Sequence, residues 1–420
     1  MASSPVRLAL LLVTLVILTI GLLSLRPTAV EPIRIGAVHA LSGVMAESER
    51  GLVDAVQLAV DEINRDGGLL ERHVELMVAD SRSDWTVAAN QVERLILKDG
   101  VSALFGCWTS ACRQAVRPVV EKHHHLLFYP LQYEGLEQSP NIVYMGSAPN
   151  QQIIPGARWA LDHFGRRIYL VGSDYVFPRT ANQLIRDLVI AADGEIIAER
   201  YVPLDATAFA DIAADIRRQA PDAVLNTLNG TANRHFFAAL AAAGADALPV
   251  VSFSMAEPEL QSMRTAHVHA AHYAVWGYFQ SLPHAANQRF VADFRQRFGP
   301  ERVISDPVVT SYDAVRLWAA AVRAAGTPDP AQINRSIGRM GVDGPSGIVA
   351  VDAATRHLWR RVYVGRARAD GQFEVTEISE APVRPVPFPP YRGRDEWLEL
   401  VRTLLTATDS HHPKEAGEEW

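Results

Sequence analysis

The stretch Leu104-Phe105-Gly106-Cys107-Trp108-Thr109-Ser110 decides the fold of this chain. Its apolar run stops at Gly106, and Thr109 or Ser110 can cap a helix that follows directly. The stretch therefore predicts the carboxyl end of a short buried strand that turns at once into a helix. In an open parallel sheet, such a junction faces the crevice where small ligands bind. It also sets a flat aromatic ring beside two hydroxyl groups, which suits a small planar polar molecule.

Strands alternate with helices on both sides of this stretch. Before it, residues 33–38 and 74–79 are expected to be strands, each followed by an amphipathic helix. After it come a helix from Ser110, a strand at 126–129, an irregular segment to Asn150, and a second alternating set from 153 to 276. This spacing predicts right-handed crossovers and parallel sheets with helices on both faces.

Two consecutive alternating sets predict an α/β protein with two Rossmann-like lobes joined by a hinge, with the ligand crevice between them. Helices expected near 285–298 and 307–325 do not fit a third sheet, so they are expected to return to the first lobe. The first lobe then comprises residues 33–150 and about 280–345, and the second comprises 151–279 and about 346–395. Residues 396–420 form a C-terminal tail, with a last helix expected over 393–405.

A hydrophobic segment precedes the lobes. Residues 8–25 carry no charge between Arg7 and Arg26, and the length lies between a signal-peptide core and a membrane span. The pair Pro27 and Ala29 makes a poor cleavage site. Residues 1–30 are therefore expected to form a hydrophobic helix that anchors the chain to the inner membrane, with a cleaved signal peptide as the alternative. Either reading predicts an exported, periplasmic protein.

Composition narrows the classes of function. The chain has 420 residues, of which 48% are hydrophobic and 21% charged, as in ordinary globular proteins, and its net charge of -7 argues against nucleic acid as a partner. Cys107 and Cys112 are the two cysteines; two reduced, packed thiols are expected, with one strained bridge as the alternative. Residues 123–125 are three histidines in a predicted surface loop, because consecutive side chains diverge. No metal and no cofactor are expected.

Several motifs occur together in the order typical of one family. They are 106–110 (GCWTS), 129–135 (YPLQYEG), 141–144 (NIVY), 148–151 (APNQ), 172–179 (GSDYVFPR) and 253–257 (FSMAE). Over about residues 33–395 the chain resembles the type I periplasmic binding proteins, in the branch that holds the urea-binding component of ABC transporters and the short-amide-sensing regulator of the amidase operon. Trp108, Gln132 and Asn229-Gly230 look like the urea-binding proteins, whereas 382–397 looks more like the amide regulator.

The resemblance places Trp108, Ser110, Tyr129, Leu131 and Tyr175 at ligand-contact positions. Buried urea or acetamide needs a partner for each of its polar groups, because an unmet group costs a few kcal/mol. We expect hydroxyl groups to donate to its carbonyl, carbonyl or carboxylate oxygens to accept from its amino groups, and aromatic rings to cover its faces. These roles fall in order to Ser110 with Tyr129, Gln132 with Glu257, and Trp108 with Tyr175.

Each candidate also has a structural alternative. Ser110 can simply cap the helix, Trp108, Tyr129 and Tyr175 can be core aromatics, and Glu257 can be an acid favoured at a helix start. The predicted function is an extracytoplasmic solute-binding protein that delivers urea or a short-chain amide to an ABC transporter permease. A ligand-sensing receptor that signals to a membrane sensor is the first alternative. An amide hydrolase is remote: it would use Cys107, Lys98 and Glu134, and the chain is predicted not to be an enzyme.

Overall fold

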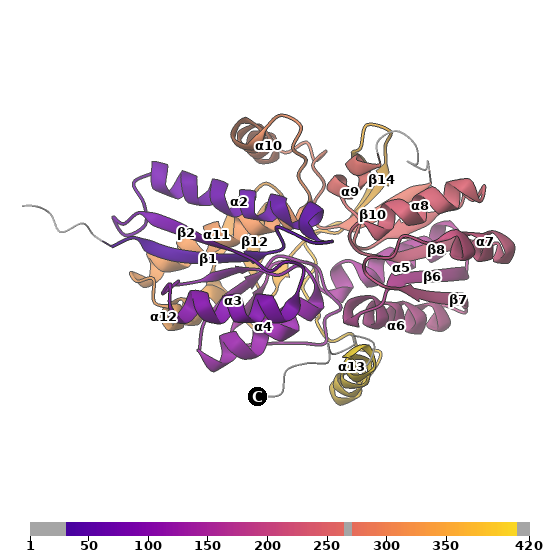
Figure 1. The fold of residues 1–420 in the computed structure, drawn as a ribbon, viewed down its shortest axis with the longest axis horizontal. Coiled ribbons are helices and arrows are strands. Elements are labelled where there is room, and N and C mark those ends of the chain that lie inside the picture. The colour runs from indigo at the N-terminus through magenta and orange to yellow at the C-terminus, as the bar shows by residue number, and fades with distance from the viewer. Residues whose placement is uncertain (1–30, 264–270, 410–420) are drawn as a thin grey trace, which may run out of the picture.

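The computed structural model describes residues 31–263 and 271–409, which form two α/β lobes side by side (Figure 1). The first lobe holds a five-stranded sheet in the order β2-β1-β3-β4-β5, and all neighbouring strands in it are parallel. Its strands are β1 (Ile33–His39), β2 (Val74–Asp80), β3 (Leu104–Gly106), β4 (Leu127–Tyr129) and β5 (Ile142–Tyr144). The helices between them are α2 (Ala46–Arg65), α3 (Trp85–Leu97) and α4 (Ser110–Lys122).

Strand β5 lies inside the segment that the sequence pattern predicts to be irregular, so that prediction is wrong at this point. The three residues Ile142–Tyr144 are buried and pair in register with Leu127–Tyr129. A strand of three residues that is buried on both faces shows no alternation of polar and apolar positions, which is why periodicity misses it.

The second lobe holds a seven-stranded sheet in the order β15-β14-β10-β9-β8-β6-β7. The pairs from β10 to β7 are parallel, whereas β14 is antiparallel to both β10 and β15. Its strands are β6 (Arg167–Ser173), β7 (Glu195–Val202), β8 (Ala223–Thr227), β9 (Val250–Ser252), β10 (His272–Trp276), β14 (Tyr363–Ala367) and β15 (Phe373–Ile378). Its helices are α5 (Ile153–His163), α6 (Val176–Ala191), α7 (Ala210–Gln219), α8 (Ala232–Ala242) and α9 (Glu257–Ser262), and a short 3₁₀ turn, η1 (Pro149–Gln151), precedes α5.

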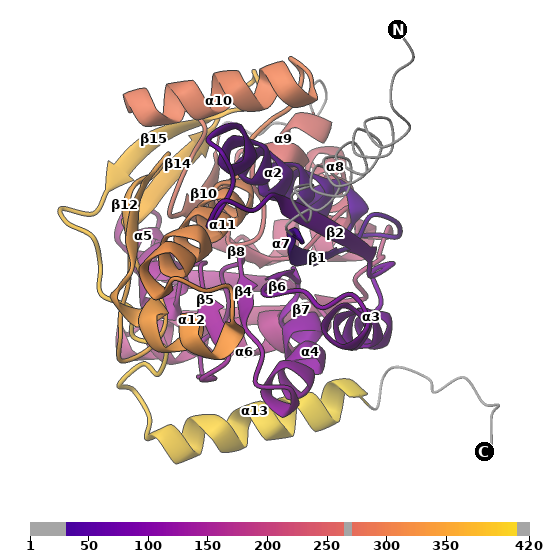
Figure 2. The same cartoon turned by 90° about the vertical axis from the view of Figure 1, so that its left-hand side faces the viewer.

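After β10 the chain crosses back toward the first sheet. Helix α11 (Asp306–Ala325) packs along α2 (Figure 2), and the Tyr312 hydroxyl donates to Glu62 Oε2 over 2.6 Å. A small antiparallel sheet of β11 (Gly341–Gly344), β12 (Gly347–Val351) and β13 (Leu358–Trp359) follows, and His357 forms a bridge with Tyr144 of β5. The remaining elements here are α10 (Ala285–Phe298), α12 (Pro330–Ser336) and the 3₁₀ turn η2 (Ile337–Arg339).

The last helix, α13 (Arg394–Asp409), confirms the predicted C-terminal helix and packs against α6. Trp397 is completely buried, and its Nε1 donates to the carbonyl oxygen of Pro389 over 2.8 Å. Just before the helix, Arg392 binds both carboxylate oxygens of Asp187 at 2.8 Å. These contacts hold the C-terminal segment on the second lobe.

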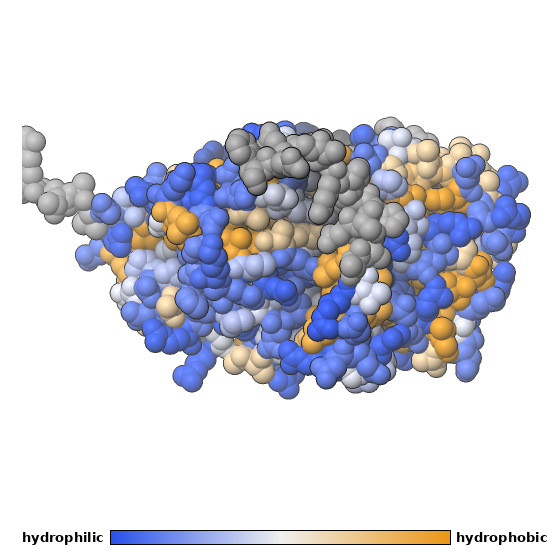
Figure 3. All heavy atoms as spheres, turned by 60° about the horizontal axis from the view of Figure 1, so that its bottom comes forward, coloured by the Kyte–Doolittle hydropathy of each residue, from blue (hydrophilic) through white to orange (hydrophobic). Residues whose placement is uncertain are grey.

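On the face drawn in Figure 3, hydrophilic side chains dominate and hydrophobic ones form separate patches. Among residues 31–263 and 271–409, no helix is long and apolar enough to cross a membrane. The hydrophobic helix predicted at residues 8–25 lies outside the described residues.

Candidate ligand-binding site

The site begins at the turn between β3 and α4. Gly106 lies so close to β1 that a Cβ atom there would stand 2.3 Å from the carbonyl oxygen of Val38, so a side chain does not fit. The next residue, Cys107, has a left-handed backbone with a φ of 65°. This sharp turn lifts Trp108 to Ser110 off the end of the strand and toward the second lobe.

A disulfide joins Cys107 and Cys112, so the expectation of two reduced thiols is wrong. The left-handed turn and the first turn of α4 bring the two Cα atoms to 5.6 Å, which is within the range that a disulfide spans. The bond also removes the nucleophile of the hydrolase alternative, because Cys107 carries no thiol. Lys98, the base of that alternative, is an exposed residue at the end of α3.

Thr109, rather than Ser110, caps helix α4. The Thr109 Oγ1 atom accepts a hydrogen bond of 3.1 Å from the backbone N–H of Cys112. Ser110 is therefore available for other contacts, and it makes two of them with charged side chains. Its hydroxyl donates to Glu134 Oε2 over 2.5 Å and accepts from Arg113 Nη1 over 3.0 Å.

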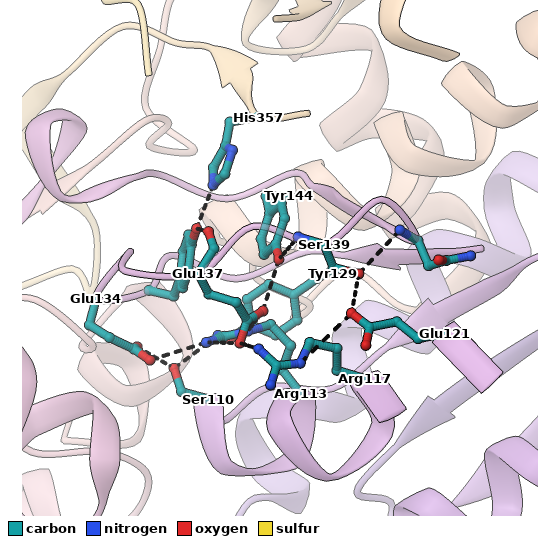
Figure 4. A network of polar contacts seen from close by, with 12 residues as sticks. Ser110, Arg113, Arg117, Glu121, Tyr129, Glu134, Glu137, Ser139, Tyr144 and His357 are labelled. Atoms are coloured by element: carbon teal, nitrogen blue, oxygen red, sulfur yellow. Dashed lines mark hydrogen bonds and ion pairs between the residues drawn. The ribbon is translucent and has the colours of Figure 1, made fainter. Parts of the chain in front are cut away.

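Arg113 is the centre of a buried charge cluster with Glu134, Glu137 and Arg117 (Figure 4). The Arg113 guanidinium lies 3.1 Å from Glu134 and 3.0 Å from Glu137, and Arg117 reaches the second oxygen of Glu137 at 3.1 Å. Burial alone would lower the pKa of Arg113, but the charges of Glu137 and Glu134 outweigh it and raise that pKa. Two guanidinium groups thus face two buried carboxylates, and Arg117 also lies 3.9 Å from Glu121 on the solvent side.

The same network extends to the small third sheet through Tyr144 and His357. The Tyr144 hydroxyl donates to Glu137 Oε1 over 2.8 Å, and its ring stacks on His357 with 4.3 Å between the ring centres. His357 Nε2 lies 2.5 Å from the Tyr133 hydroxyl. Burial lowers the pKa of His357 to about 4, so the imidazole is neutral at pH 7.

Aromatic side chains from both lobes gather next to this cluster. The Tyr129 hydroxyl donates to the carbonyl oxygen of Trp108 over 2.7 Å, and the Arg113 guanidinium lies 4.9 Å from the centre of the Tyr129 ring. Tyr175, at the start of α6 in the second lobe, is also buried. Burial raises the pKa of Tyr175, and the nearby Tyr129 and Glu134 add to the rise. Trp108, Ser110, Tyr129 and Tyr175 are thus brought together.

The side chains of Trp108 and Gln132 make hydrogen bonds between the lobes across this site. Trp108 Nε1 donates to Asn229 Oδ1 over 3.3 Å, from the β3–α4 turn to the loop after β8. Gln132 Nε2 donates to the Phe253 carbonyl oxygen and to Ser254 Oγ, both at 3.1 Å, from the loop after β4 to the end of β9. Since these side chains are almost completely buried, the lobes stand closed over the site.

Gln132 and Leu131 are buried in the loop after β4, and Glu257 is buried at the start of α9. Gln132 Oε1 has no hydrogen-bond partner in the described chain, and Leu131 is 1% exposed. Glu257 Oε1 accepts from the backbone N–H of Gln280 over 2.8 Å, while its Oε2 is unpaired within the described residues. Burial raises the pKa of Glu257 to about 8, with a further contribution from Asp306. The contacts of Glu257 are thus with the crossover after β10, not with the Trp108 turn.

The hydroxyl roles expected from the sequence differ from those observed. Ser110 and Tyr129 were expected to donate to a ligand carbonyl, yet both donate to acceptors of the protein, Glu134 and the Trp108 backbone. The Tyr175 hydroxyl makes no hydrogen bond within the described part of the chain. Of the hydroxyl groups of Ser110, Tyr129 and Tyr175, that of Tyr175 is therefore the one that can donate to a bound molecule.

Sequence reasoning missed Arg113 and Glu137 as members of this cluster. Arg113 follows Ser110 by three residues, which places both on one face of α4, and Glu137 follows Glu134 by three. The spacing of Ser110 and Arg113 on α4 was the available signal, because Glu134 and Glu137 lie in a loop where a spacing of three residues defines no common face. In the described chain, no group of three or more His, Cys, Asp or Glu side chains is arranged to hold a metal ion. Of the three predicted loop histidines, His125 is buried and bonds to the Val101 carbonyl at 2.8 Å.

Comparison with known proteins places the chain in a family. The model of the family described as periplasmic binding protein domain matches residues 33–394. This chain belongs to that family. Its fold agrees: a solute-binding protein of an ABC transporter from R. palustris, in complex with 4-hydroxybenzoate, superposes with a TM-score of 0.76 at 22% identity, covering 84% of this chain and 98% of that one.

Other proteins similar to this chain carry different names and ligands. A branched-chain amino acid transporter substrate-binding protein from Streptococcus pneumoniae, in complex with isoleucine, superposes with a TM-score of 0.72 at 20% identity over 83% of this chain and 99% of that one. The Leu/Ile/Val-binding protein homolog 6 of Brucella melitensis biotype 1 is 23% identical over 81% of this chain and 89% of its own length. A 114-residue stretch is 32% identical to limonene hydroxylase of Geobacillus stearothermophilus, which covers 27% of this chain and 21% of that protein.

Proposed function

We propose that the chain is an extracytoplasmic solute-binding protein that captures urea or a short-chain amide between its lobes and delivers it to an ABC transporter permease. The pairing of Arg113 beside Ser110 carries this proposal. Arg113 is held by Glu134 and Glu137, so it does not offer an unpaired positive charge to a carboxylate ligand. A neutral amide needs only hydrogen-bond partners and aromatic faces.

The remaining polar groups suit such a ligand. The Tyr175 hydroxyl can donate to a carbonyl oxygen, and Gln132 Oε1 can accept from an amino group. Glu257 lies four residues after the Phe253 that Gln132 contacts, and its Oε2 is unpaired within the described residues. Because burial raises the pKa of Glu257 to about 8, this carboxyl is mostly protonated at pH 7 and would donate to a ligand carbonyl rather than accept from an amino group. Leu131 supplies an apolar wall, and the Trp108 ring covers one face of the ligand.

The proposed division of the chain follows the sequence analysis. Residues 33–150 with about 280–345 form one lobe, and 151–279 with about 346–395 form the other. Closing these lobes on the ligand would create the surface that a permease recognises. The disulfide supports an oxidising, extracytoplasmic location, since such bonds are rare in reducing compartments.

A second candidate ligand is a branched-chain amino acid, and the Brucella relative named as a Leu/Ile/Val-binding protein homolog favours it. The two candidates differ in charge, because an amino acid brings a carboxylate into the closed cleft and an amide does not. Burying that carboxylate would require donors that the Arg113 cluster does not offer.

Calorimetric titration of the purified protein with urea, acetamide, leucine and 4-hydroxybenzoate tests the proposal. We expect saturable 1:1 binding of urea or acetamide and at least a hundredfold weaker binding of the two carboxylates. Tight binding of leucine with no binding of amides would replace the proposal by the second candidate. Binding of 4-hydroxybenzoate alone would also contradict it.

Trp108→Ala tests the site itself. We expect the affinity for the amide to fall at least tenfold while the folded structure persists, because the side chain lies on a turn held by the disulfide. Trp108→Phe keeps an aromatic face but loses the hydrogen bond to Asn229, so its affinity for the amide should lie between those of the unmodified protein and Trp108→Ala. Tyr391→Ala, at an exposed aromatic residue, is the matched control and should bind as the unmodified protein does.

A further inference from the structure

A cavity lies apart from the Trp108 turn, where segments connecting the lobes meet. Its volume is about 260 Å³. One wall is Thr310 and Asp313 of α11, and the others come from the end of β10, the β11–β12 turn, the β13–β14 connection and Pro382. Apolar atoms of Val349, Leu358 and Trp359 contribute to its lining.

Asp313 is the unusual group in this cavity. Its side chain is 2% exposed, and neither carboxylate oxygen has a hydrogen-bond partner among the described residues. The nearest cation, Arg316 Nη1, is 3.7 Å away and donates instead to the carbonyl oxygen of Asp343 over 2.6 Å. Leaving a buried carboxylate with both oxygens unpaired is costly, so such a group is expected to have a partner.

The other charged groups around the cavity have partners elsewhere. Arg360 pairs with Asp306 and donates to the carbonyl oxygen of Met145 over 2.9 Å. Arg361 donates to the backbone oxygens of Ser379 and Glu380. The exposed His284 also borders the cavity.

We propose that this cavity binds a small protonated primary amine, whose ammonium group donates hydrogen bonds to both oxygens of Asp313 and whose alkyl part packs against Val349, Leu358 and Trp359. The ammonium group supplies several N–H donors together with the missing positive charge, which water cannot do. A short alkyl chain matches both the volume and the apolar wall.

The position of this site gives it a structural consequence. The β13–β14 connection and Gly277 lead into the second sheet, whereas α11 packs along α2 of the first. An amine bound between them would contact elements of both lobes. Its occupancy would therefore shift the balance between open and closed lobes if its contacts differ between the two states.

The charge state of Asp313 sets the pH at which binding develops. Burial raises the pKa of Asp313 to about 7; Arg316 and Arg360 act in the opposite direction, and Asp306 and Asp343 add to the rise. The carboxylate form therefore grows from a minor to a major fraction between pH 6 and pH 8. Alkylammonium ions stay protonated throughout that range, so their affinity should rise with pH by about tenfold.

The test is calorimetric titration of the whole protein with n-propylammonium at pH 8, with n-propanol and tetramethylammonium as controls. We expect saturable 1:1 binding of n-propylammonium, no saturable binding of n-propanol, and none of tetramethylammonium, which has no N–H group. Asp313→Asn keeps the shape but removes the charge, and it should weaken binding at least tenfold. Ser346→Trp would fill the cavity from its half-exposed rim and should abolish binding even if Asp313→Asn folds poorly.

The two sites can be separated in the same samples. Trp108→Ala should retain amine binding, and Asp313→Asn should retain binding of the amide, so failure of one proposal leaves the other standing. Absence of saturable n-propylammonium binding at pH 8, or equal affinity in Asp313→Asn, would overturn the amine site. An n-propanol affinity equal to that of n-propylammonium would overturn it as well.

Discussion

Two buried regions of this molecule differ in how their carboxyl groups are paired. Around Arg113, every carboxylate meets a guanidinium or a hydroxyl at hydrogen-bond distance. Around the lobe connections, Asp313 has no hydrogen-bond partner in the described chain, and Glu257 leaves one oxygen unpaired. The pKa of Glu137 is lowered, because Arg113 and Arg117 outweigh the effect of burial, whereas that of Glu257 is raised to about 8 by burial.

The contrast shows how the environment decides whether a buried acid keeps its charge. A partner cation lets Glu137 remain ionised in a site that contains almost no solvent. Without such a cation, an acid remains neutral to a higher pH, and its later ionisation weakens the fold. The free energy of unfolding should therefore be most sensitive to mutation in the Arg113 region and most sensitive to pH through the acids at the lobe connections.

Arg113→Met would have the largest effect, since it leaves Glu134 and Glu137 buried with little compensation. We expect the free energy of unfolding at pH 7 to fall by about 3–5 kcal/mol. The matched control is Arg117→Met, whose side chain is 38% exposed and should cost about 1 kcal/mol or less. Urea-free measurement by guanidinium denaturation avoids the proposed ligand, and equal losses in the two variants would contradict the central place of Arg113.

Glu257→Gln sharpens the other side of the comparison. Because the pKa of Glu257 rises from the ordinary 4.5 to about 8 in the folded protein, the folded state keeps a proton that the unfolded chain loses. The contribution of this bound proton to the free energy of unfolding is complete below pH 4.5. It is lost as the pH rises through 8, with a slope of about 1.4 kcal/mol per pH unit. The variant should lose less stability than the unmodified protein between pH 5 and pH 8, measured by denaturation at each pH.

The exposed Glu374 provides the control for that experiment. Glu374→Gln should leave the pH dependence unchanged, because the group is solvated in both states. Since Asp313 also has a raised pKa, the unmodified curve contains its contribution too, and the difference between Glu257→Gln and the unmodified protein isolates Glu257. Parallel curves for those two proteins would show that Glu257 is not neutral at pH 7.

The smallest effects come from single hydroxyl groups. Tyr144→Phe removes a donor to Glu137 and should lower the free energy of unfolding by about 1–2 kcal/mol. Ser305→Ala, beside Asp306 at the start of α11, removes a buried hydroxyl that has no partner in the described chain and does not cap the helix. It should change stability by about 0.5 kcal/mol or less. A larger loss in Ser305→Ala than in Tyr144→Phe would reverse the comparison.

Local patterns predict much of this fold. Repeated alternation of apolar runs and amphipathic helices identifies the strands of both sheets except β5, and the β14–β15 pair follows from two short strands around a turn at Gly371. Strand β5 is not predicted, because its three buried residues show no alternation of polar and apolar positions. The disulfide could not be decided either, since it depends on a left-handed residue at Cys107 that no sequence pattern indicates.

The candidate site is predictable only where its residues lie close together along the chain. Trp108 and Ser110 sit on one turn and could be recognised as a unit. The bond from Trp108 to Asn229 joins residues 121 positions apart, so it exists only through the packing of the two lobes. Arg113 looked like one of the ordinary charged residues of a surface helix; its burial depends on Glu134 and Glu137, which reach it from a loop with no secondary structure.

Because Cys107 and Cys112 are joined by a disulfide, the conformation of the turn that carries Trp108 depends on whether the chain has been oxidised. The disulfide closes a ring of six residues that contains Trp108 and Ser110, and a ring of that size removes roughly 2 kcal/mol of chain entropy from the unfolded state. Forming it requires an oxidant to accept two electrons. Before oxidation, the newly made chain has the same sequence but a less constrained turn. The turn takes the conformation described above only after the disulfide has formed in an oxidising compartment.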